Sequence, residues 1–379
     1  MTMTVMITTG GTGGHVFPGL AVAAKLAALG AGVFWLGTRG GIESRLVPQH
    51  GVEFEGLSFR GVRGKGLRTL LLGPFALLAA CLDARTIIGR RKPDVVLGFG
   101  GYASFPGGLM GAAAGKPLVL HDANAVAGLA TRVLAYGADR ILLGFPQALH
   151  GAHAKRVEWV GNPLRDSVCT LPPPAERFNG RSGPMRLLIV GGSLGARGLN
   201  DLVPAAIAQI PLPERPLVVH QAGDKHIAAL REAYARHGVD GECVAFIDDM
   251  AARYAWADFV ICRGGGLTVA ELAAVGLGAF IVPLPGAIAD EQSANAQFLV
   301  DAGAAWKEPQ DVLTADRLAA LLRLLDRPRA RAMAEAAHAQ GKRDAAERVA
   351  AICAELAMAV PRGSTRSSAS TSSALAAPA

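Results

Sequence analysis

The sequence contains little that would indicate a metal site or a disulfide framework. Only five of its 379 residues are cysteines, and they are scattered along the chain without a C-x-x-C pair. Scattered cysteines argue against zinc sites and fit a reducing compartment. There is no H-E-x-x-H and no D-x-D sequence either, so nothing suggests a metal-bridged diphosphate. We expect neither a metal ion nor another cofactor.

Signals for secretion and for crossing a membrane are also missing. The first residues do not form a basic segment followed by an apolar segment and a small-residue cleavage site. The longest apolar run, Leu70–Leu82, has 13 residues with an internal Gly-Pro. A membrane-spanning helix needs about 20. These absences predict a cytoplasmic protein.

Charge narrows the choice of partners. The net charge of +7 favours an acidic partner, such as an anionic lipid or a phosphorylated substrate. Only 38 of the 379 residues are lysine or arginine, and no stretch interleaves them with aromatic residues. A nucleic-acid groove combines these features. We therefore expect no nucleic-acid partner.

The Leu70–Leu82 run has two interpretations. It is either a buried crossover helix with solvated ends or an apolar patch that rests on an anionic membrane surface. Both can hold for different residues of the run. The membrane interpretation draws on the basic residues that flank the run: Arg60, Arg63, Lys65, Arg68, Arg85, Arg90, Arg91 and Lys92.

Strand-like and helix-like segments alternate along the first half, which is typical of a parallel sheet with crossover helices. The Pro/Gly-rich stretch Thr170–Pro184 is interpreted as a linker. A second strand-and-glycine pattern begins at Met185 and repeats the first, so the fold class is α/β, with two Rossmann-like domains that face a cleft. Strands of the first half are predicted at residues 5–8, 32–36, 94–98, 117–121, 140–143 and 157–160.

A glycine-rich loop follows the first predicted strand. Four of the five residues in Gly10–Gly14 are glycine, and a helical pattern begins after Pro18. A strand, loop and helix in this order direct backbone N–H groups at a negatively charged ligand. The dinucleotide fingerprint would need glycine at Val16, so the loop predicts an anion site without specifying a nucleotide. His15 at its edge is either a functional group or a cap of the turn.

The strongest signal of the second half is Arg263–Ala274, an arginine and three glycines at the end of a strand, followed by a helical pattern. Free N–H groups, the helix dipole and the guanidinium could hold a diphosphate without metal. Glu271 could accept hydrogen bonds from a ribose, or it could simply be a first-turn glutamate that the helix dipole stabilises. The polar cluster Asp290–Ala296 suits sugar hydroxyls or helix capping, and Asp248-Asp249 suits a loop or an N-cap.

Taken together, these stretches resemble the MurG family of peptidoglycan N-acetylglucosaminyltransferases. This family moves GlcNAc from UDP-GlcNAc to undecaprenyl-diphosphate-linked MurNAc-pentapeptide (lipid I), which gives lipid II. The resemblance implies a GT-B fold and an inverting, metal-independent transfer. The matching segments keep the family's order and spacing: Gly10–Ala23, Lys92–Gly108, Leu118–Leu134, Val160–Arg165, Leu187–Ala196, Phe246–Asp258, Cys262–Ala274, and Gln292 with Asn295-Ala296.

The resemblance also implies a division of labour along the chain. Residues 1–165 would form an acceptor-binding and membrane-associating domain, and residues 166–342 the UDP-GlcNAc-binding domain. A helix at 343–360 is expected to pack back on the first domain, and residues 361–379 are expected to be a disordered tail. The protein would lie peripherally on the cytoplasmic face of the inner membrane, with other cell-wall synthesis proteins as further partners.

The implied donor site draws on both halves. Ile247 would bind uracil through its backbone, Glu271 the ribose, Ser193 the diphosphate, and Gln292 the GlcNAc hydroxyls. The acceptor diphosphate would lie at Gly13, Gly14, Gly100, Gly101 and Tyr102. The residues implied to contact UDP-GlcNAc are Thr12, Gly13, Gly14, Asn124, Arg165, Ser193, Ile247, Leu267, Thr268, Val269, Ala270, Glu271 and Gln292.

The sequence departs from the family pattern at three places. Asp122-Ala123 stands where the family commonly has Glu-Gln, Leu194 where it has Gln, and Gly264 where it has Ser. These positions bear on acceptor contacts and on the fine geometry of the donor site rather than on the reaction class.

The implied reaction is a direct displacement at the anomeric carbon by the C4 hydroxyl of MurNAc, forming a β-1,4 bond. Such a step needs a base near the hydroxyl and donors that stabilise the departing UDP. His15 is the candidate base, because its loop would project into the cleft. Three alternatives stay open: a UDP-GlcNAc 2-epimerase, another GT-B lipid glycosyltransferase such as a diacylglycerol galactosyltransferase, and a non-catalytic nucleotide-sugar-binding scaffold.

Overall fold

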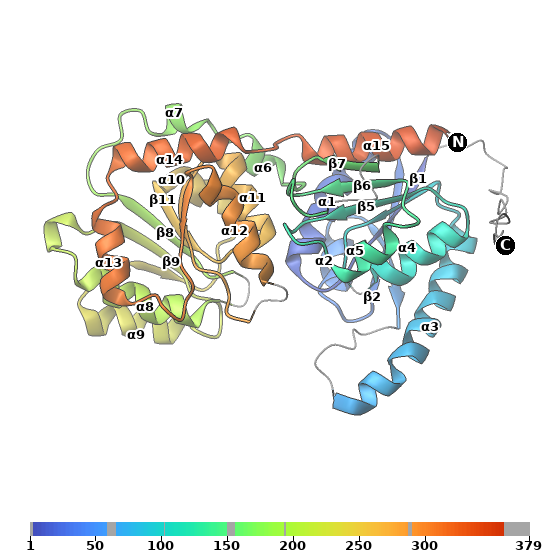
Figure 1. Ribbon diagram of the computed structural model, residues 1–379, viewed down its shortest axis with the longest axis horizontal. Helices are drawn as coiled ribbons and strands as arrows, with labels where there is room; N and C mark the ends of the chain where they lie inside the picture. The colour runs from blue at the N-terminus through green and yellow to red at the C-terminus, as the bar shows by residue number, and fades with distance from the viewer. Residues whose placement is uncertain are drawn as a thin grey trace, which may run out of the picture.

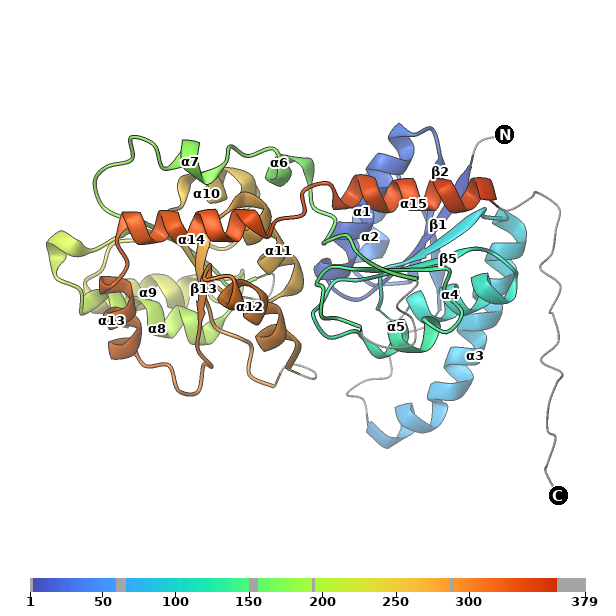
Figure 2. The same cartoon turned by 45° about the horizontal axis from the view of Figure 1, so that its top comes forward.

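The structure is a computed structural model that describes residues 3–58, 66–101, 103–149, 156–192, 195–286 and 290–359. Two α/β domains lie side by side, and the chain crosses between them twice (Figure 1). Each domain is a parallel sheet with helices against both faces, as the turned view also shows (Figure 2). The predicted α/β class with two Rossmann-like domains is confirmed. The expected tail, 361–379, lies outside the described residues.

The N-terminal sheet contains all six strands that the sequence predicts in the first half, and one more. The additional edge strand is short and contains glutamate and glycine, which are depleted in strands, so the sequence analysis missed it. Its two glutamates, Glu53 and Glu55, form ion pairs with Arg91 and Arg90. The order of this seven-stranded sheet is β3 (Glu53–Leu57), β2 (Gly32–Thr38), β1 (Thr4–Thr8), β4 (Val95–Gly98), β5 (Leu118–Asp122), β6 (Arg140–Leu143) and β7 (Val157–Trp159).

The C-terminal sheet has six strands. They lie in the order β10 (Glu242–Val244), β9 (Leu217–Gln221), β8 (Arg186–Val190), β11 (Phe259–Cys262), β12 (Gly278–Ile281) and β13 (Ala305–Lys307).

Helices cover both sheets. Those of the first domain are α1 (Gly13–Ala28), α2 (Glu43–Gln49), α3 (Gly66–Arg91), α4 (Ser104–Ala113) and α5 (Leu129–Leu134). Those of the second are α8 (Arg197–Ala208), α9 (Ile227–His237), α10 (Met250–Trp256), α11 (Gly266–Val275), α12 (Glu291–Asp301), α13 (Ala315–Arg323) and α14 (Arg327–Ala339), with the 3₁₀ turn η2 (Leu212–Glu214).

The two sheets share one strand order, and this order positions the glycine loops. In each sheet the first strand lies between the second and the fourth: β1 pairs with β2 and β4, and β8 pairs with β9 and β11. The order therefore reverses between β1 and β4, and again between β8 and β11. Ligands of open α/β sheets bind beyond the carboxyl ends of the strands at such a point. The four glycine loops of the sequence follow these four strands.

Glycine also sets how closely α1 packs on its sheet. A Cβ added to Gly19 would lie 2.5 Å from Cη2 of Trp35, a fully buried side chain of β2. Val5 and Ile7 of β1 lie in the same core. The start of α1 is thereby held against the carboxyl ends of the central strands.

The segment from Thr170 to Pro184, which the sequence predicts as a linker, packs against the C-terminal domain. It contains helix α7 (Pro174–Arg177), which follows the short helix α6 (Asp166–Cys169). Arg177 is buried and donates hydrogen bonds to the carbonyls of Pro172, Tyr254, Val275 and Gly276. Pro174 stands at the first position of α7, where proline favours the start of a helix. Arg177 anchors α7 to the C-terminal domain.

The last described helix, α15 (Ala345–Ala359), lies against α1 of the N-terminal domain (Figure 1). Val349, Ile352 and Cys353 are buried in the core that α1 and β1 form. Burying a valine or isoleucine side chain contributes about 1.5–3 kcal/mol. The last described helix thus packs on the N-terminal domain.

Helix α3 projects from the N-terminal domain (Figure 1) and contains the apolar run of the sequence. Ala84 and Ile88 pack in the core, whereas Phe75, Leu78 and Leu82 are 71%, 59% and 57% exposed. No helix among the described residues is long and apolar enough to cross a membrane. The buried-helix interpretation is confirmed for part of the run, because Ala80 lies in the same core. The opposite side of α3 is an exposed apolar surface, and its contact with a membrane stays a prediction.

Candidate active site

The loop after β1 is shorter than the sequence indicates. The sequence pattern predicts the helix after Pro18, but α1 begins at Gly13 and contains Pro18 as a buried residue. Gly13 and Gly14 therefore stand in its first turn, and their N–H groups have no acceptor among the described residues. The N-cap Thr12 makes no side-chain cap. Free N–H groups at a helix N-terminus form an anion site.

The glycine loops after β1 and β4 contact each other directly. Gly101 has φ +80°, and a Cβ on it would lie 1.8 Å from the carbonyl oxygen of Gly10, so only glycine fits. The Thr9 hydroxyl donates to the carbonyl of Gly100 at 2.9 Å. The predicted acceptor residues Gly13, Gly100 and Gly101 are thus brought to one place. Tyr102 lies outside the described residues.

His15 lies in the first turn of α1, beside the β4 loop. A Cβ on Gly100 would lie 3.6 Å from its Nδ1. The Nδ1 atom is buried without a hydrogen-bond partner, while the residue as a whole is partly exposed. Burial lowers the pKa of His15 below 6.5, against the opposing charge of Asp122. His15 is therefore a neutral imidazole at neutral pH, the form that can accept a proton.

A buried carboxylate supports the first glycine loop. Glu43 is fully buried, and its Oε1 accepts hydrogen bonds from the N–H and the hydroxyl of Thr38 at 2.9 and 2.5 Å. Its Oε2 accepts a long bond from the Gly11 N–H at 3.5 Å. Sequence reasoning missed Glu43, since no motif connects it to the loop.

The end of β5 and the loop after it are held by two polar side chains, His121 and Asp122. His121 is a core residue: Nε2 donates to the Gly161 carbonyl at 2.9 Å, and burial lowers its pKa to about 4. Asp122 accepts from the N–H groups of Asn124 and Gly128 at 3.2 and 3.0 Å. Asp122 therefore shapes the loop that presents Asn124. Asp122 is one of the positions at which the sequence departs from the family pattern, and there its carboxylate holds the loop together.

In the C-terminal domain, α11 directs its N-terminus at the junction of the two domains. Its N-cap is Gly265, which has no side chain to cap the first turn, and the Val269 N–H makes the first bond, to the Gly265 carbonyl at 3.0 Å. The N–H groups of Gly266 to Thr268 are left to bind an anion. Leu267, Thr268 and Ala270 are half-buried, while Val269 faces the core.

Arg263 does not belong to this anion site. Its Nη1 donates to the carbonyls of Val282 and Pro283 at 3.1 and 3.2 Å, and its Nη2 donates to Oε1 of Gln310 at 2.5 Å. The guanidinium instead holds the backbone just after β12 through these hydrogen bonds. The expectation that it helps to hold a diphosphate is corrected, and the N–H groups of α11 remain for that task.

Glu271 connects the two domains through a basic residue. Tyr254 donates its hydroxyl to Oε2 of Glu271 at 2.9 Å, and Nη2 of Arg165 lies 3.6 Å from Oε1. Burial raises the pKa of Glu271, while Arg165 and then Tyr254 lower it. The Arg165 guanidinium also lies over the ring of Phe17 in α1, 5.8 Å from its centroid. Tyr254 was not singled out from the sequence.

The remaining predicted donor residues surround α11. The backbone of Ile247 has no hydrogen-bond partner among the described residues, although its side chain is buried. Gln292 accepts from the Leu284 N–H at 2.9 Å. A Cβ on Gly264 would lie 2.2 Å from the carbonyl oxygen of Gln292. The missing serine at 264 thus lets the start of α12 lie closer to the loop. Ser193 and Leu194 lie outside the described residues.

Asn124 meets the C-terminal domain at the first residue of α11. A Cβ on Gly266 would lie 2.8 Å from Oδ1 of Asn124 and 2.3 Å from the carbonyl oxygen of Ala123. The structure therefore places Asn124, Arg165 and Glu271 at the junction between the domains.

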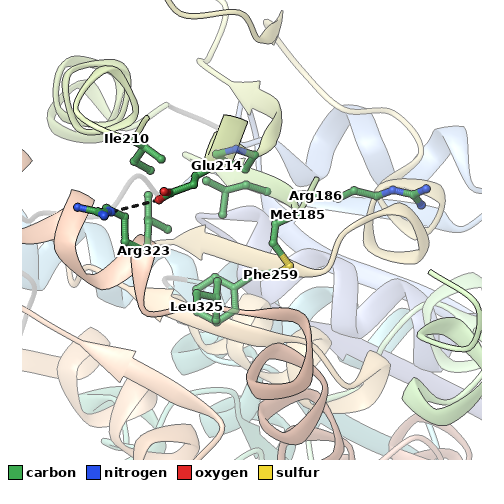
Figure 3. A pocket seen from close by; sticks show the side chains of 10 residues that line it. Met185, Arg186, Ile210, Glu214, Phe259, Arg323 and Leu325 are labelled. Atoms are coloured by element: carbon green, nitrogen blue, oxygen red, sulfur yellow. Dashed lines mark hydrogen bonds and ion pairs between the residues drawn. The ribbon is translucent and has the colours of Figure 1, made fainter. Parts of the chain in front are cut away.

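No group of three or more potential metal ligands was found among the described residues. Asp249 is the N-cap of α10 and accepts from the Ala252 N–H at 2.9 Å, as the sequence predicts. A cavity of about 290 Å³ lies at the opposite, amino edge of the C-terminal sheet (Figure 3). Arg323 and Glu214 pair at its wall at 3.3 Å. This cavity is remote from the glycine loops and does not belong to the site.

Two Rossmann-like domains, each directing a glycine loop and a helix N-terminus at their junction, define the class of GT-B glycosyltransferases. Comparison with known families agrees. Residues 5–143 match the N-terminal domain of glycosyltransferase family 28, and residues 186–349 match its C-terminal domain. The chain belongs to glycosyltransferase family 28.

Individual relatives are similar over nearly their full length. The chain is 54% identical to a protein of Aromatoleum aromaticum and 55% identical to one of an Azoarcus species, covering 93% of this chain and 98% of each relative. Both are named UDP-N-acetylglucosamine–N-acetylmuramyl-(pentapeptide) pyrophosphoryl-undecaprenol N-acetylglucosamine transferase. The crystal structure of MurG from Acinetobacter baumannii matches with a TM-score of 0.80 and 35% identity, over 93% of this chain and 99% of the other.

Proposed function

We propose that this chain transfers GlcNAc from UDP-GlcNAc to the C4 hydroxyl of MurNAc in lipid I, which yields lipid II with a β-1,4 bond. The names of its relatives support these substrates. The observation that carries the proposal is the position of Arg165, which lies over Phe17 of α1 and pairs with Glu271 of α11. Arg165 thus contacts both α1 and α11, the two helices whose N-terminal turns are the proposed sites of the acceptor diphosphate and the donor diphosphate.

The donor binds mainly to the C-terminal domain in this proposal. The unpaired backbone of Ile247 suits the uracil edge, and the carboxylate of Glu271 suits the ribose hydroxyls. The first turn of α11 binds the diphosphate, together with Ser193. The donor would further contact Thr12, Gly13, Gly14, Asn124, Arg165, Leu267, Thr268, Val269, Ala270 and Gln292.

The transfer is a single displacement with His15 as the base. The C4 oxygen of MurNAc attacks the anomeric carbon, and the bond from that carbon to the UDP oxygen breaks, so UDP leaves with the electron pair. His15 takes the proton of the attacking hydroxyl. Its neutral state and its place beside the glycine loop of β4 support this role. The α11 N-terminus stabilises the charge that develops on UDP.

The acceptor diphosphate binds to the first turn of α1 and the adjoining loop in this proposal. The N–H groups of Gly13 and Gly14 have no acceptor among the described residues, Gly101 contacts Gly10 of the same loop, and Gly100 lies beside His15. Tyr102, implied by the resemblance, follows Gly101 in the sequence. Because Gly100 lies next to His15, a diphosphate bound at this loop would put the sugar of the acceptor near the base.

A lipid-linked substrate requires the protein to contact a membrane surface. In this proposal the exposed apolar side of α3 makes that contact. Phe75, Leu78 and Leu82 recur at helical spacing and are exposed. Arg85 on the same helix is exposed as well. Arg90 and Arg91 pair with glutamates of β3, so they contribute less positive charge than the sequence indicates. The protein would bind peripherally to the anionic cytoplasmic face of the inner membrane.

The transfer is tested with labelled GlcNAc on UDP and a short-chain lipid I analogue, with and without EDTA. We expect a disaccharide product in both samples. Release of ManNAc from UDP-GlcNAc alone would instead identify a 2-epimerase, and UDP-GlcNAc binding without any product would identify a scaffold.

Membrane contact is tested by sedimentation with anionic vesicles. Serine at Phe75, Leu78 and Leu82 should reduce vesicle binding while leaving transfer to a short-chain, water-soluble acceptor intact. The matched control puts serine at Leu212, Leu217 and Leu324 of the C-terminal domain, which are 75%, 51% and 60% exposed. Equal losses in both triple variants would remove α3 from this role.

A further inference from the structure

One buried side chain of the C-terminal domain binds the loop that carries Asn124. Asn295 of α12 is fully buried. Its Oδ1 accepts a hydrogen bond from the Ala125 N–H at 2.7 Å, and its Nδ2 donates to the Gly264 carbonyl at 3.0 Å and to Oδ1 of Asn124 at 3.1 Å. Two of the three bonds cross from one domain to the other. The third holds the glycine loop that precedes α11.

The chemistry of these partners determines the orientation of both amides. The Ala125 N–H can only donate and the Gly264 carbonyl can only accept, so a flipped Asn295 amide would lose both bonds. The second Nδ2 hydrogen of Asn295 then requires an acceptor, which is Oδ1 of Asn124. The amide nitrogen of Asn124 is therefore turned away from Asn295 and is left to donate to a ligand.

A second buried asparagine holds the same two loops from the other side. Asn162, which is 1% exposed, donates from Nδ2 to the carbonyls of Ala123 and Gly266 at 3.0 and 3.4 Å. Residues 123–125 are thus attached to the start of α11 at two points. The direction of the Asn124 amide is in this way coupled to the relative position of the domains.

We propose that Asn295 is a positioning residue, which presents the Asn124 amide nitrogen as a hydrogen-bond donor to the GlcNAc part of the donor and does not itself touch substrate. This inference rests on the proposed binding of UDP-GlcNAc at the junction. All polar atoms of the Asn295 side chain are engaged by protein groups. Aspartate at position 295 would place a carboxylate oxygen opposite Oδ1 of Asn124, and the two oxygens would repel each other. The Asn124 amide would then rotate, so that its oxygen instead of its nitrogen would face the ligand.

The test is a double-mutant cycle of Asn295→Asp and Asn124→Ala in the full chain, read as kcat/KM for GlcNAc transfer and as affinity for UDP-GlcNAc and for UDP. Asn295→Asp alone should lower kcat/KM and UDP-GlcNAc affinity about threefold to tenfold, the size of one lost hydrogen bond to a neutral sugar group. UDP affinity should stay near the wild-type value. In the Asn124→Ala background, Asn295→Asp should have little further effect.

Independent, additive losses in the cycle would overturn the proposal, because Asn295 would then act by a route other than Asn124. Gln297→Glu is the matched control: it changes an amide to an acid on the same helix, where the side chain contacts only Asp301 and Lys307 of its own domain. It should keep wild-type affinity. If Asn295→Asp does not fold, Asn295→Ser enters the same cycle. A wild-type chain that binds UDP-GlcNAc without transfer would contradict the proposed function, while the binding measurements still decide the role of Asn295.

Discussion

Arg165 and Glu271 face each other across the junction of the two domains, with Nη2 of the arginine 3.6 Å from Oε1 of the glutamate. Arg165 is 44% exposed in its side chain and Glu271 only 10%. The glutamate is therefore the buried, fixed partner, held by Tyr254 at 2.9 Å. In the proposed function a ribose would bind at this carboxylate, and Arg165 would turn toward the donor diphosphate.

Glu271→Gln should weaken UDP binding by about tenfold, because the charged acceptor of the ribose hydroxyls is replaced by a neutral one. Titration calorimetry with UDP measures this effect. Glu214→Gln, at the opposite edge of the same sheet, serves as the control and should bind UDP normally. An unchanged UDP affinity in Glu271→Gln would contradict the ribose role.

The same residue predicts a pH dependence of UDP binding. Burial raises the pKa of Glu271 above 4.5, so its binding-competent carboxylate is present above the raised pKa and is lost as the pH falls through it. UDP affinity should therefore decline at a higher pH than an ordinary glutamate would allow. Glu271→Gln should lack this part of the decline. The titration is followed by calorimetry from neutral pH downward.

His15→Ala should lower kcat by about a hundredfold or more, the usual contribution of a general base, while UDP affinity stays unchanged. Since burial lowers the pKa of His15 below 6.5, the neutral base persists below that pH, and the acid limb of the kcat profile should lie there. Near-normal turnover of His15→Ala with saturating substrates would remove His15 from the reaction.

Gly101→Ala should separate the two glycine loops of the N-terminal domain and abolish most of the transfer. Its Cβ would lie 1.8 Å from the Gly10 carbonyl oxygen, in addition to the cost of φ +80°. Gly180→Ala is a matched control, because Gly180 has φ +69° but nothing within 4 Å of the added Cβ. The control should lose only about 1–2 kcal/mol of stability, from the backbone conformation alone. Similar activity in both variants would show that the contact with Gly10 is unimportant.

Arg177→Met should reduce the free energy of unfolding by about 3 kcal/mol, since several buried carbonyls would lose a charged donor. Two of these contacts hold Val275 and Gly276, at the end of α11. Chemical denaturation measures the loss. Arg331→Met, which removes an exposed pair with Glu335 on α14, should change stability by less than about 1 kcal/mol. A comparable loss in both would show that the buried contacts add little.

Local pattern was enough to locate the glycine loops and most strands. Residues 5–8 and 95–97 are β-branched or apolar, and the glycines behind them mark where the strands end, which is information carried within a few residues. Pattern failed where the tertiary structure outweighs local preference. Pro18 sits inside α1, the Pro-rich stretch after Thr170 contains α7, and the alternating strand at Glu53 is stabilised by arginines of α3.

The supporting residues of the site could not be predicted in this way. Asn295 binds Ala125 across 170 positions of sequence, Glu43 binds Gly11 across 32, and Tyr254 binds Glu271 across 17. None of these pairs forms a motif, because each contact exists only after strands and helices have been placed. Arg263 shows the converse: it stands in a strong motif, yet its guanidinium binds Gln310.

The sequence by itself determined the α/β class, the four glycine loops and, by resemblance, the residues that would bind the donor. These features depend on backbone conformation and periodicity, which neighbouring residues specify. Only the tertiary structure decided which N–H groups are free, which carboxylates are buried, and which side chain joins the domains. Burial and hydrogen-bond pairing are properties of distant segments packed together, and the Asn295–Asn124 pair exists only because α12 and the β5 loop meet.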